Sequence, residues 1–253
     1  MAPPHTVEIR GPAVPVDLVR SDHLVRKRSC SPDTPTTSRD RVLLRTLELN
    51  VATTIVYETH SITTDNEAGI ATGWLPGELS PRGRELAREL GERRRHDGLA
   101  AVFTSDLRRA VQTAELAFAG IDIPIHQDER LRECDYGEWN GMPVARLAAE
   151  RSRHVDVPWP GGQSYRQVVE HTRDFLTDLA GLWDGRRVLL IAHSANRWAL
   201  GHLLGGQALE DLVDAPFAWR EGWVYELSER WGDAIRASDE TSPCSPAARP
   251  GDR

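Results

Sequence analysis

The sequence contains few cysteines, a single lysine and no long apolar segment. Its three cysteines, Cys30, Cys134 and Cys244, are an odd number, lie far apart and have no CxxC spacing. This pattern argues against both a disulfide framework and a cysteine-based zinc site. No apolar stretch approaches the ~20 residues that a membrane-spanning helix needs, and the first residues lead into no hydrophobic signal segment. We therefore expect a cytoplasmic protein that makes no membrane contact.

Because the only lysine is Lys27, basic contacts in the rest of the chain must come from arginine or histidine. The whole chain has a net charge of −7, and residues 51–230 alone carry −8. An acidic core of this kind argues against nucleic acid as a partner. Arginine is suited to bidentate binding of phosphate or carboxylate, which favours a small anionic ligand.

The 253 residues, of which 40% are hydrophobic, fit one globular domain with flexible ends. The segment 29–38 is rich in Ser, Thr and Pro and is predicted to be a linker. We interpret residues 1–48 as a flexible N-terminal extension, residues 49–230 as the functional domain and residues 231–253 as a disordered tail.

Short apolar runs alternate with stretches of helical periodicity along residues 49–230. An alternation of this kind predicts an α/β fold, a three-layer α/β/α sandwich with a mainly parallel central sheet. The runs predicted as strands are Thr53–Tyr57, Leu99–Phe103, Ile121–Ile125, Arg187–Ala192 and a final hairpin or edge strand within residues 217–228. The predicted helices begin near Ser80, Asp106, Tyr165 and Asn196.

Two of the predicted strands run directly into a histidine, His60 and His193. Open α/β sheets place functional side chains beyond the carboxyl ends of their strands, so we expect the two imidazoles to share one crevice. A metal site at this pair is ranked low, because the chain has no HExxH motif and no tight His/Cys cluster. The fingerprints GxGxxG, GxxxxGK[ST] and GxSxG are all absent, which argues against nucleotide loops and a serine nucleophile elbow.

An arginine and an acidic loop complete the candidate site. Arg108 and Arg109 lie in the first turn of a predicted helix, where the helix dipole disfavours cations, so a nearby anion is indicated; a solvent-facing side chain accounts well enough for Arg108. The turn-rich loop 131–141 carries three carboxylates. One of them is a candidate general acid, provided that desolvation raises its pKa.

Over roughly residues 51–228 the chain resembles the histidine phosphatase superfamily, whose fold is phosphoglycerate mutase-like. The resemblance rests on the order and spacing of several short motifs, each weak by itself. They are His60 with Asn66 and Gly73, Leu79-Ser80-x-x-Gly83, Ser105-Asp106-Leu107-x-Arg109-Ala110-x-x-Thr113-Ala114, Leu131-x-Glu133-x-x-x-Gly137-x-Trp139-x-Gly141, Pro160-Gly161-Gly162-x-Ser164 and His193.

The resemblance implies a metal-independent phosphomonoester hydrolase without a cofactor, acting on a small phosphorylated molecule. His60 would form a phosphohistidine, Arg109 and His193 would hold the phosphoryl oxygens, and Glu133 would serve as general acid and then base. The remaining predicted substrate-binding residues are Thr59, Ser61, Asn66 and Ser194. Oligomeric state is left open, with a homodimer as one option.

The chain also departs from the family pattern. The usual Arg-His-Gly is Thr59-His60-Ser61 here, and the usual His-Gly is His193-Ser194. The loss of an arginine leaves three readings: a phosphatase, slow or with the charge supplied elsewhere; a pseudophosphatase, binding protein or enzyme for a non-phosphate substrate; and, less favoured, a phosphomutase. Candidates for the replacement cation are Arg82, Arg108, Arg132 and Arg197. Among the tryptophans, Trp74 and Trp159 are the favoured substrate contacts.

Overall fold

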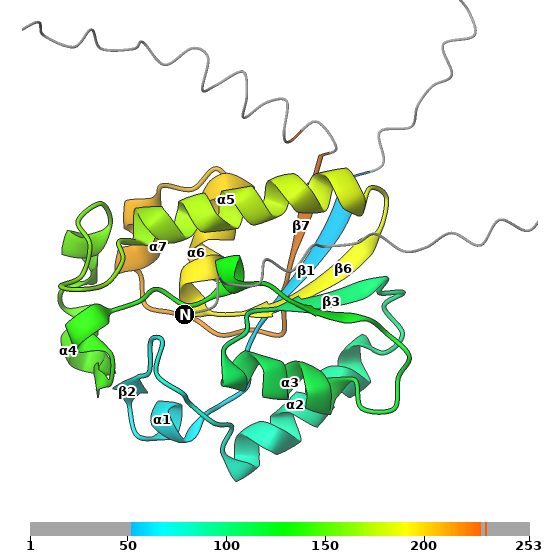
Figure 1. The fold of residues 1–253 in the computed structure, drawn as a ribbon, viewed down its shortest axis with the longest axis horizontal. Coiled ribbons are helices and arrows are strands. Elements are labelled where there is room, and N and C mark those ends of the chain that lie inside the picture. Colours follow the sequence, from blue (N-terminus) through cyan, green and yellow to red (C-terminus); the bar gives the residue numbers. More distant parts are fainter. Residues whose placement is uncertain (1–51, 229–230, 232–253) are drawn as a thin grey trace, which may run out of the picture.

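The computed structural model describes residues 52–228 and Trp231. Its centre is a five-stranded sheet in the order β4-β3-β6-β1-β7 (Figure 1). The first four strands are parallel and β7 pairs antiparallel with β1. The strand bounds are β1 Thr53–Thr59, β3 Ala101–Thr104, β4 Ile125–Gln127, β6 Arg187–Ala192 and β7 Trp223–Leu227.

Helices cover both faces of this sheet, so the predicted three-layer α/β/α sandwich is confirmed (Figure 1). Helices α2 (Pro81–Arg94) and α3 (Arg108–Ala117) pack on one face, and α5 (Tyr165–Leu182) and α6 (Ser194–Leu203) cover the other. Helix α7 (Leu209–Asp214) packs against α6.

Strand β1 shows how the sequence directs this layering. Alternate side chains of a strand point to opposite faces of its sheet. Ile55 and Tyr57 pack towards α5, whereas Val56 joins Leu90 of α2 in the core on the other face. Because helices cover both faces, the strand is apolar on both sides, as is typical of parallel sheets.

Smaller elements lie beyond the carboxyl ends of the parallel strands. A two-stranded sheet pairs β2 (Ile70–Ala71) with β5 (Met142–Pro143), and it is flanked by the short helices α1 (Thr64–Glu67) and α4 (Val144–Ala148). Three single-turn 3₁₀ helices occupy the loops at Glu129–Leu131, Gly137–Trp139 and Arg151–His154. These elements form the surroundings of the site.

One predicted strand is displaced. The apolar run Ile121–Ile125 was expected to be a strand, but β4 begins only at Ile125. The residues before it form a turn in which the Ile123 N–H donates to the Ile121 carbonyl, and Pro124 has no N–H to donate to a neighbouring strand. The predicted extension 1–48 and nearly all of the predicted tail 231–253 lie outside the described residues. Within the described part of the chain, no helix is both long and apolar enough to cross a membrane.

Candidate active site

The candidate site lies at the carboxyl edge of the sheet, where β1 and β6 end side by side. Thr59 and Ala192 are paired in the parallel register, and the His60 N–H donates to the Ala192 carbonyl at 2.8 Å. This pairing carries His60 and His193 out of the sheet at the same level. Their ring centroids are 5.1 Å apart, so the two imidazoles lie together as expected, although only His60 lines the cavity.

His60 is held in a defined tautomer. Its Nδ1 lies 2.8 Å from the Ser61 carbonyl, which can only accept, so Nδ1 carries the proton and Nε2 keeps its lone pair. Nε2 accepts a hydrogen bond from Arg109 Nε at 3.2 Å. Burial, and then the Arg109 charge, lower the pKa of His60 to about 3. The ring is therefore neutral at physiological pH.

Arg109 is buried in the first turn of α3, with 2% of its surface exposed. Its Nη2 donates to the Gly73 carbonyl at 2.8 Å, whereas the buried Nη1 has no hydrogen-bond partner in the described residues. An unpaired buried donor is costly, and an anion bound here would supply its missing acceptor. This geometry fits the anion that the helix position predicted from sequence.

His193 is fully buried at the start of α6. Its Nε2 is 2.7 Å from the Ser105 hydroxyl, which lies just beyond β3, and its carbonyl accepts a hydrogen bond from the Tyr57 hydroxyl. Burial, followed by the charge of Arg109, places the pKa of His193 well below its ordinary value. The Ser105 hydroxyl also accepts from the Leu107 N–H at 3.3 Å, and the expected cap near Ser105 is wrong, because α3 begins only after Leu107 and has no side-chain cap.

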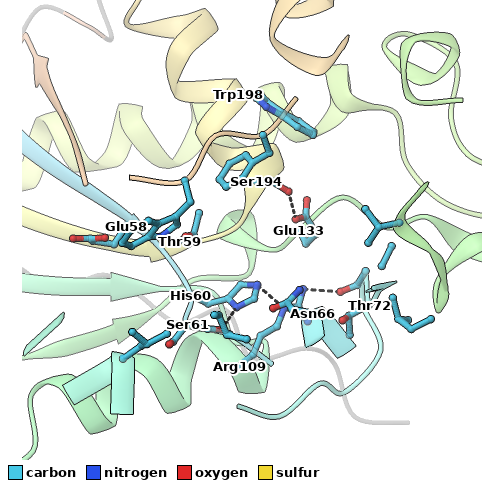
Figure 2. A pocket seen from close by; sticks show the side chains of 18 of the residues that line it. Glu58, Thr59, His60, Ser61, Asn66, Thr72, Arg109, Glu133, Ser194 and Trp198 are labelled. Atoms are coloured by element: carbon cyan, nitrogen blue, oxygen red, sulfur yellow. Dashed lines mark hydrogen bonds between the residues drawn. The ribbon is translucent and has the colours of Figure 1, made fainter. Parts of the chain in front are cut away.

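Glu133 lies across the cavity from His60, in the loop after the first 3₁₀ helix (Figure 2). Its Oε1 accepts hydrogen bonds from the N–H groups of Cys134 at 2.9 Å and Ala195 at 3.2 Å. The Ser194 hydroxyl donates to its Oε2 at 2.9 Å. Three donors thus fix the carboxylate beside the start of α6, within reach of a ligand held between it and His60.

The other predicted binding residues differ in how free they are. Thr59 and Asn66 both line the cavity. The Asn66 Oδ1 accepts from the Thr63 N–H at 3.0 Å as part of a helix cap, while its amide nitrogen makes no hydrogen bond within the described chain. The Ser61 hydroxyl donates a hydrogen bond to the Gly83 carbonyl at 2.7 Å, and the Ser194 hydroxyl donates one to the Glu133 carboxylate. Both hydroxyl protons therefore have protein acceptors.

None of the four arginines considered as a replacement for the family arginine lines the cavity. Arg82, Arg108 and Arg132 pair with Glu85, Glu78 and Asp106, respectively, and Arg197 stacks over Trp223 at 5.0 Å.

The cavity contains two other cations that sequence reasoning missed, Arg93 and Arg151. Arg93 lies within the charged run 92–95 at the end of α2, and Arg151 lies in a 3₁₀ helix. No local sequence signal distinguished either from a solvent-facing arginine.

Neither tryptophan favoured as a substrate contact lines the cavity. The indole N–H of Trp74 donates to the Glu133 carbonyl at 2.6 Å, and Arg132 stacks on its ring at 4.8 Å. Trp159 is 1% exposed and packs against the ring of Tyr136. Both side chains thus support the walls of the site from behind.

The cavity has a volume of about 560 Å³. Its wall includes His60, Arg109 and Glu133, whereas His193 contributes from beneath the surface. In the described part of the chain, no three His, Cys, Asp or Glu side chains form a group that could hold a metal ion. The arrangement instead combines a neutral imidazole with an unpaired guanidinium N–H and a fixed carboxylate.

Comparison with known proteins agrees with this geometry. Curated relatives include a 2,3-bisphosphoglycerate-dependent phosphoglycerate mutase of Parvibaculum lavamentivorans, 30% identical over 182 residues, which are 66% of this chain and 87% of that protein. The corresponding mutase of Cytophaga hutchinsonii is 31% identical over 178 residues, 65% of this chain and 83% of that protein.

Solved structures are also similar to this chain, and one of them is named as a phosphatase. Bacillus stearothermophilus YhfR is similar with a TM-score of 0.61 and 28% identity, over 68% of this chain and 90% of that one. A mycobacterial glucosyl-3-phosphoglycerate phosphatase has a TM-score of 0.57 and 27% identity, over 64% and 84% of the two chains. Residues 59–221 match the histidine phosphatase superfamily (branch 1), and it is to this superfamily that the chain belongs.

Proposed function

We propose that the protein is a metal-independent phosphomonoester hydrolase that acts on a small organic phosphate through a phosphohistidine intermediate. The observation that carries the proposal is the state of His60. Its Nδ1–H donates a hydrogen bond to the Ser61 carbonyl, and its pKa of about 3 keeps Nε2 unprotonated. A neutral imidazole whose unprotonated nitrogen lies beside a buried guanidinium can attack a phosphorus atom once the incoming phosphoryl group takes over the Arg109 Nε–H.

In the first step, the Nε2 lone pair of His60 forms a bond to phosphorus. The bond from phosphorus to the leaving oxygen breaks with its electron pair on that oxygen, which takes a proton from the carboxylic acid form of Glu133. Arg109, with the unpaired N–H of its Nη1, and His193 stabilise the charge on the remaining phosphoryl oxygens.

In the second step, the Glu133 carboxylate takes a proton from a water molecule. The water oxygen bonds to phosphorus, and the N–P bond breaks with its electron pair returning to Nε2. Inorganic phosphate leaves, and Glu133 is again protonated for the next turnover. The hydrogen bonds from Ser194 and Ala195 hold the carboxylate in one position through both steps.

The threonine at position 59, in place of the family's arginine, predicts a slow reaction. Loss of one preorganised donor costs about 10²–10³ in rate, and a charge-assisted hydrogen bond is worth about 1.5–3 kcal/mol. None of the four arginines weighed as replacements reaches the cavity. The same observation supports the second reading, a protein of this fold that binds a ligand without turnover or acts on a non-phosphate substrate.

Phosphomutase activity is a third candidate, because curated relatives at about 30% identity are named phosphoglycerate mutases. We rank it below hydrolysis, since the segment between β5 and α5 holds only the five-residue α4 and one 3₁₀ turn. A mutase must keep its phosphorylated product bound for a second transfer, and this segment offers little cover for that purpose.

The test is phosphate release from an aryl phosphate in the presence of a metal chelator. We expect turnover by the wild type, none by His60→Ala, and an acid-labile phosphoenzyme on rapid quenching of the wild type alone. His171→Ala, an exposed change on α5, is the control and should match the wild type. Equal rates for wild type and His60→Ala would refute the phosphohistidine route.

The same proteins separate the alternative functions. Interconversion of 2- and 3-phosphoglycerate, primed by 2,3-bisphosphoglycerate and faster than phosphate release, would establish a mutase. Tight binding of a phosphate ester without either reaction would favour the non-catalytic reading.

A further inference from the structure

The cavity continues past the nucleophile into a groove that the reaction itself does not use. We define the α2 groove by Leu86, Leu90 and Arg93 of helix α2 and by Phe217 and Trp219 of the segment before β7. We propose that the α2 groove binds the leaving group of the substrate, and that this leaving group is an uncharged apolar or aromatic body. The proposal rests on the proposed phosphomonoesterase function.

The groove adjoins the site of chemistry. Glu58 and Thr59, which immediately precede His60, line the same cavity as the groove residues. The two walls meet near Arg94, whose Nη2 donates to the Glu221 carbonyl at 3.2 Å. A cavity of about 560 Å³ greatly exceeds what a phosphoryl group fills and falls in the range that holds whole organic ligands. An ester whose phosphorus lies at His60 can therefore extend into the groove.

The two aromatic side chains of the groove are open to solvent. Trp219 is 58% exposed and Phe217 is 39% exposed. Single exposed apolar residues are common, but a cluster around one cavity marks a binding surface. Of the nine exposed large apolar side chains in the described residues, four line this cavity, the other two being Ile62 and Val144. Covering them would remove apolar surface from water, which favours an apolar ligand.

The charges of the groove oppose a second anion. Glu58, Glu89 and Glu221 line it, against Arg93 as the lining cation on this side. Arg93 Nη2 lies 3.8 Å from Glu58 Oε1 and Arg94 binds the same oxygen at 2.7 Å, so the three carboxylates exceed these two arginines by one negative charge. A leaving group with a carboxylate or a second phosphate would meet repulsion here.

The opposite side of the cavity provides the contrasting possibility. Arg151 stacks over Trp198 at 5.2 Å and makes no ion pair among the described residues. An anionic leaving group would bind on that side, near Arg151. The two sides therefore predict opposite substrate preferences, which makes the proposal testable.

The experiment compares three aryl phosphates that share one reaction: phenyl phosphate, 4-butylphenyl phosphate and 4-carboxyphenyl phosphate. A buried methylene contributes about 0.8 kcal/mol, or about fourfold. If the butyl chain is partly buried, kcat/KM for 4-butylphenyl phosphate should exceed that for phenyl phosphate by roughly tenfold or more. For 4-carboxyphenyl phosphate, kcat/KM should be roughly tenfold lower than for phenyl phosphate, although its phenol is the better leaving group.

Variants assign the preference to the groove. Trp219→Ser and Phe217→Ala should lower kcat/KM for 4-butylphenyl phosphate several-fold more than they lower it for phenyl phosphate. Leu182→Ala removes another exposed apolar side chain, one that does not line the cavity, and should change neither. A preference for 4-carboxyphenyl phosphate that disappears in Arg151→Gln would overturn the proposal. So would an advantage of 4-butylphenyl phosphate that is unchanged in both groove variants.

Calorimetric titration separates this proposal from the proposed function. The His60→Ala protein is titrated with the same three esters, so that no turnover is required. Tighter binding of 4-butylphenyl phosphate than of phenyl phosphate, weakened by adding Trp219→Ser, supports the groove. If the wild type then hydrolyses none of the esters, only the hydrolase function fails. Hydrolysis by wild type without any preference for the butyl ester leaves the function intact and rejects the groove.

Discussion

Thr59 occupies the position directly before His60, where the family pattern has an arginine. Its side chain offers one hydroxyl in place of as many as five N–H donors and a full charge. The structure places Thr59 on the wall of the cavity, at the end of β1 and beside the nucleophile. At the scale of single residues, this exchange is the one most directly tied to the rate of the proposed reaction.

We predict that Thr59→Arg increases phosphatase activity. A guanidinium beside His60 would add charge-assisted hydrogen bonds to the phosphoryl oxygens as their charge redistributes. We expect kcat/KM for phenyl phosphate to rise by at least about tenfold, with about 10²–10³ as the upper range for one restored donor. Thr59→Met, which adds length without charge, is the control. A fall in activity in Thr59→Arg with folding intact would show that the pocket is built for another ligand.

At the scale of elements, helices α2 and α3 approach closely because Gly91 has no side chain. A Cβ at Gly91 would lie 1.9 Å from the Ala117 carbonyl oxygen of α3, so the two helices would have to separate. Alanine is favoured over glycine in a helix by about 1 kcal/mol, but this gain is smaller than the cost of disrupting a packed helix pair.

The predicted result is that Gly91→Ala lowers the free energy of unfolding by about 1–3 kcal/mol. Gly181→Ala in α5 is the matched control, because a Cβ there meets nothing within 4 Å. That variant should gain roughly 0.5–1 kcal/mol from helix propensity alone. Urea unfolding of both proteins gives the comparison, and a Gly91→Ala variant as stable as wild type would argue against the close helix contact.

At the scale of the whole molecule, the two buried histidines link stability to pH. Burial lowers the pKa of His60 to about 3 and that of His193 well below its ordinary value. Below about pH 6.5 the unfolded chain takes up these protons while the folded protein does not, so acid favours unfolding. The stabilisation is complete above pH 6.5 and is lost as the pH falls towards the folded-state values.

We predict that acidification from pH 7 to pH 5.5 lowers the free energy of unfolding, with His60 contributing on the order of 1 kcal/mol and His193 acting in the same direction. His60→Asn should remove the contribution of His60, because asparagine does not titrate. His171→Asn, an exposed change on α5, should retain the full dependence. Chemical unfolding at several pH values measures the slope, and identical slopes for His60→Asn and wild type would contradict the assigned protonation state.

Much of this architecture follows from local sequence. The runs before His60 and His193 are rich in apolar and β-branched side chains, which predicts buried parallel strands with a histidine at each carboxyl end. The basic first turn of α3 indicated the anion site at Arg109, and the motif order indicated the family. These signals lie within single elements, so the chain alone reveals them. The displaced β4 shows the limit, because Pro124 and the turn before it decide where pairing starts.

The tertiary structure decided how distant polar groups pair. Ser194 lies 61 residues beyond Glu133, yet its hydroxyl holds that carboxylate, and the Ser61 hydroxyl is taken by a carbonyl of α2. Only the packing of α2 and the 3₁₀ turns brings Arg93 and Arg151 to the cavity, because an arginine on a charged helix face looks the same in sequence whether it meets solvent or a ligand. The sequence by itself determined the fold and pointed to His60 as the proposed nucleophile; which donors are free and which surfaces surround His60 depended on long-range contacts that no local pattern encodes.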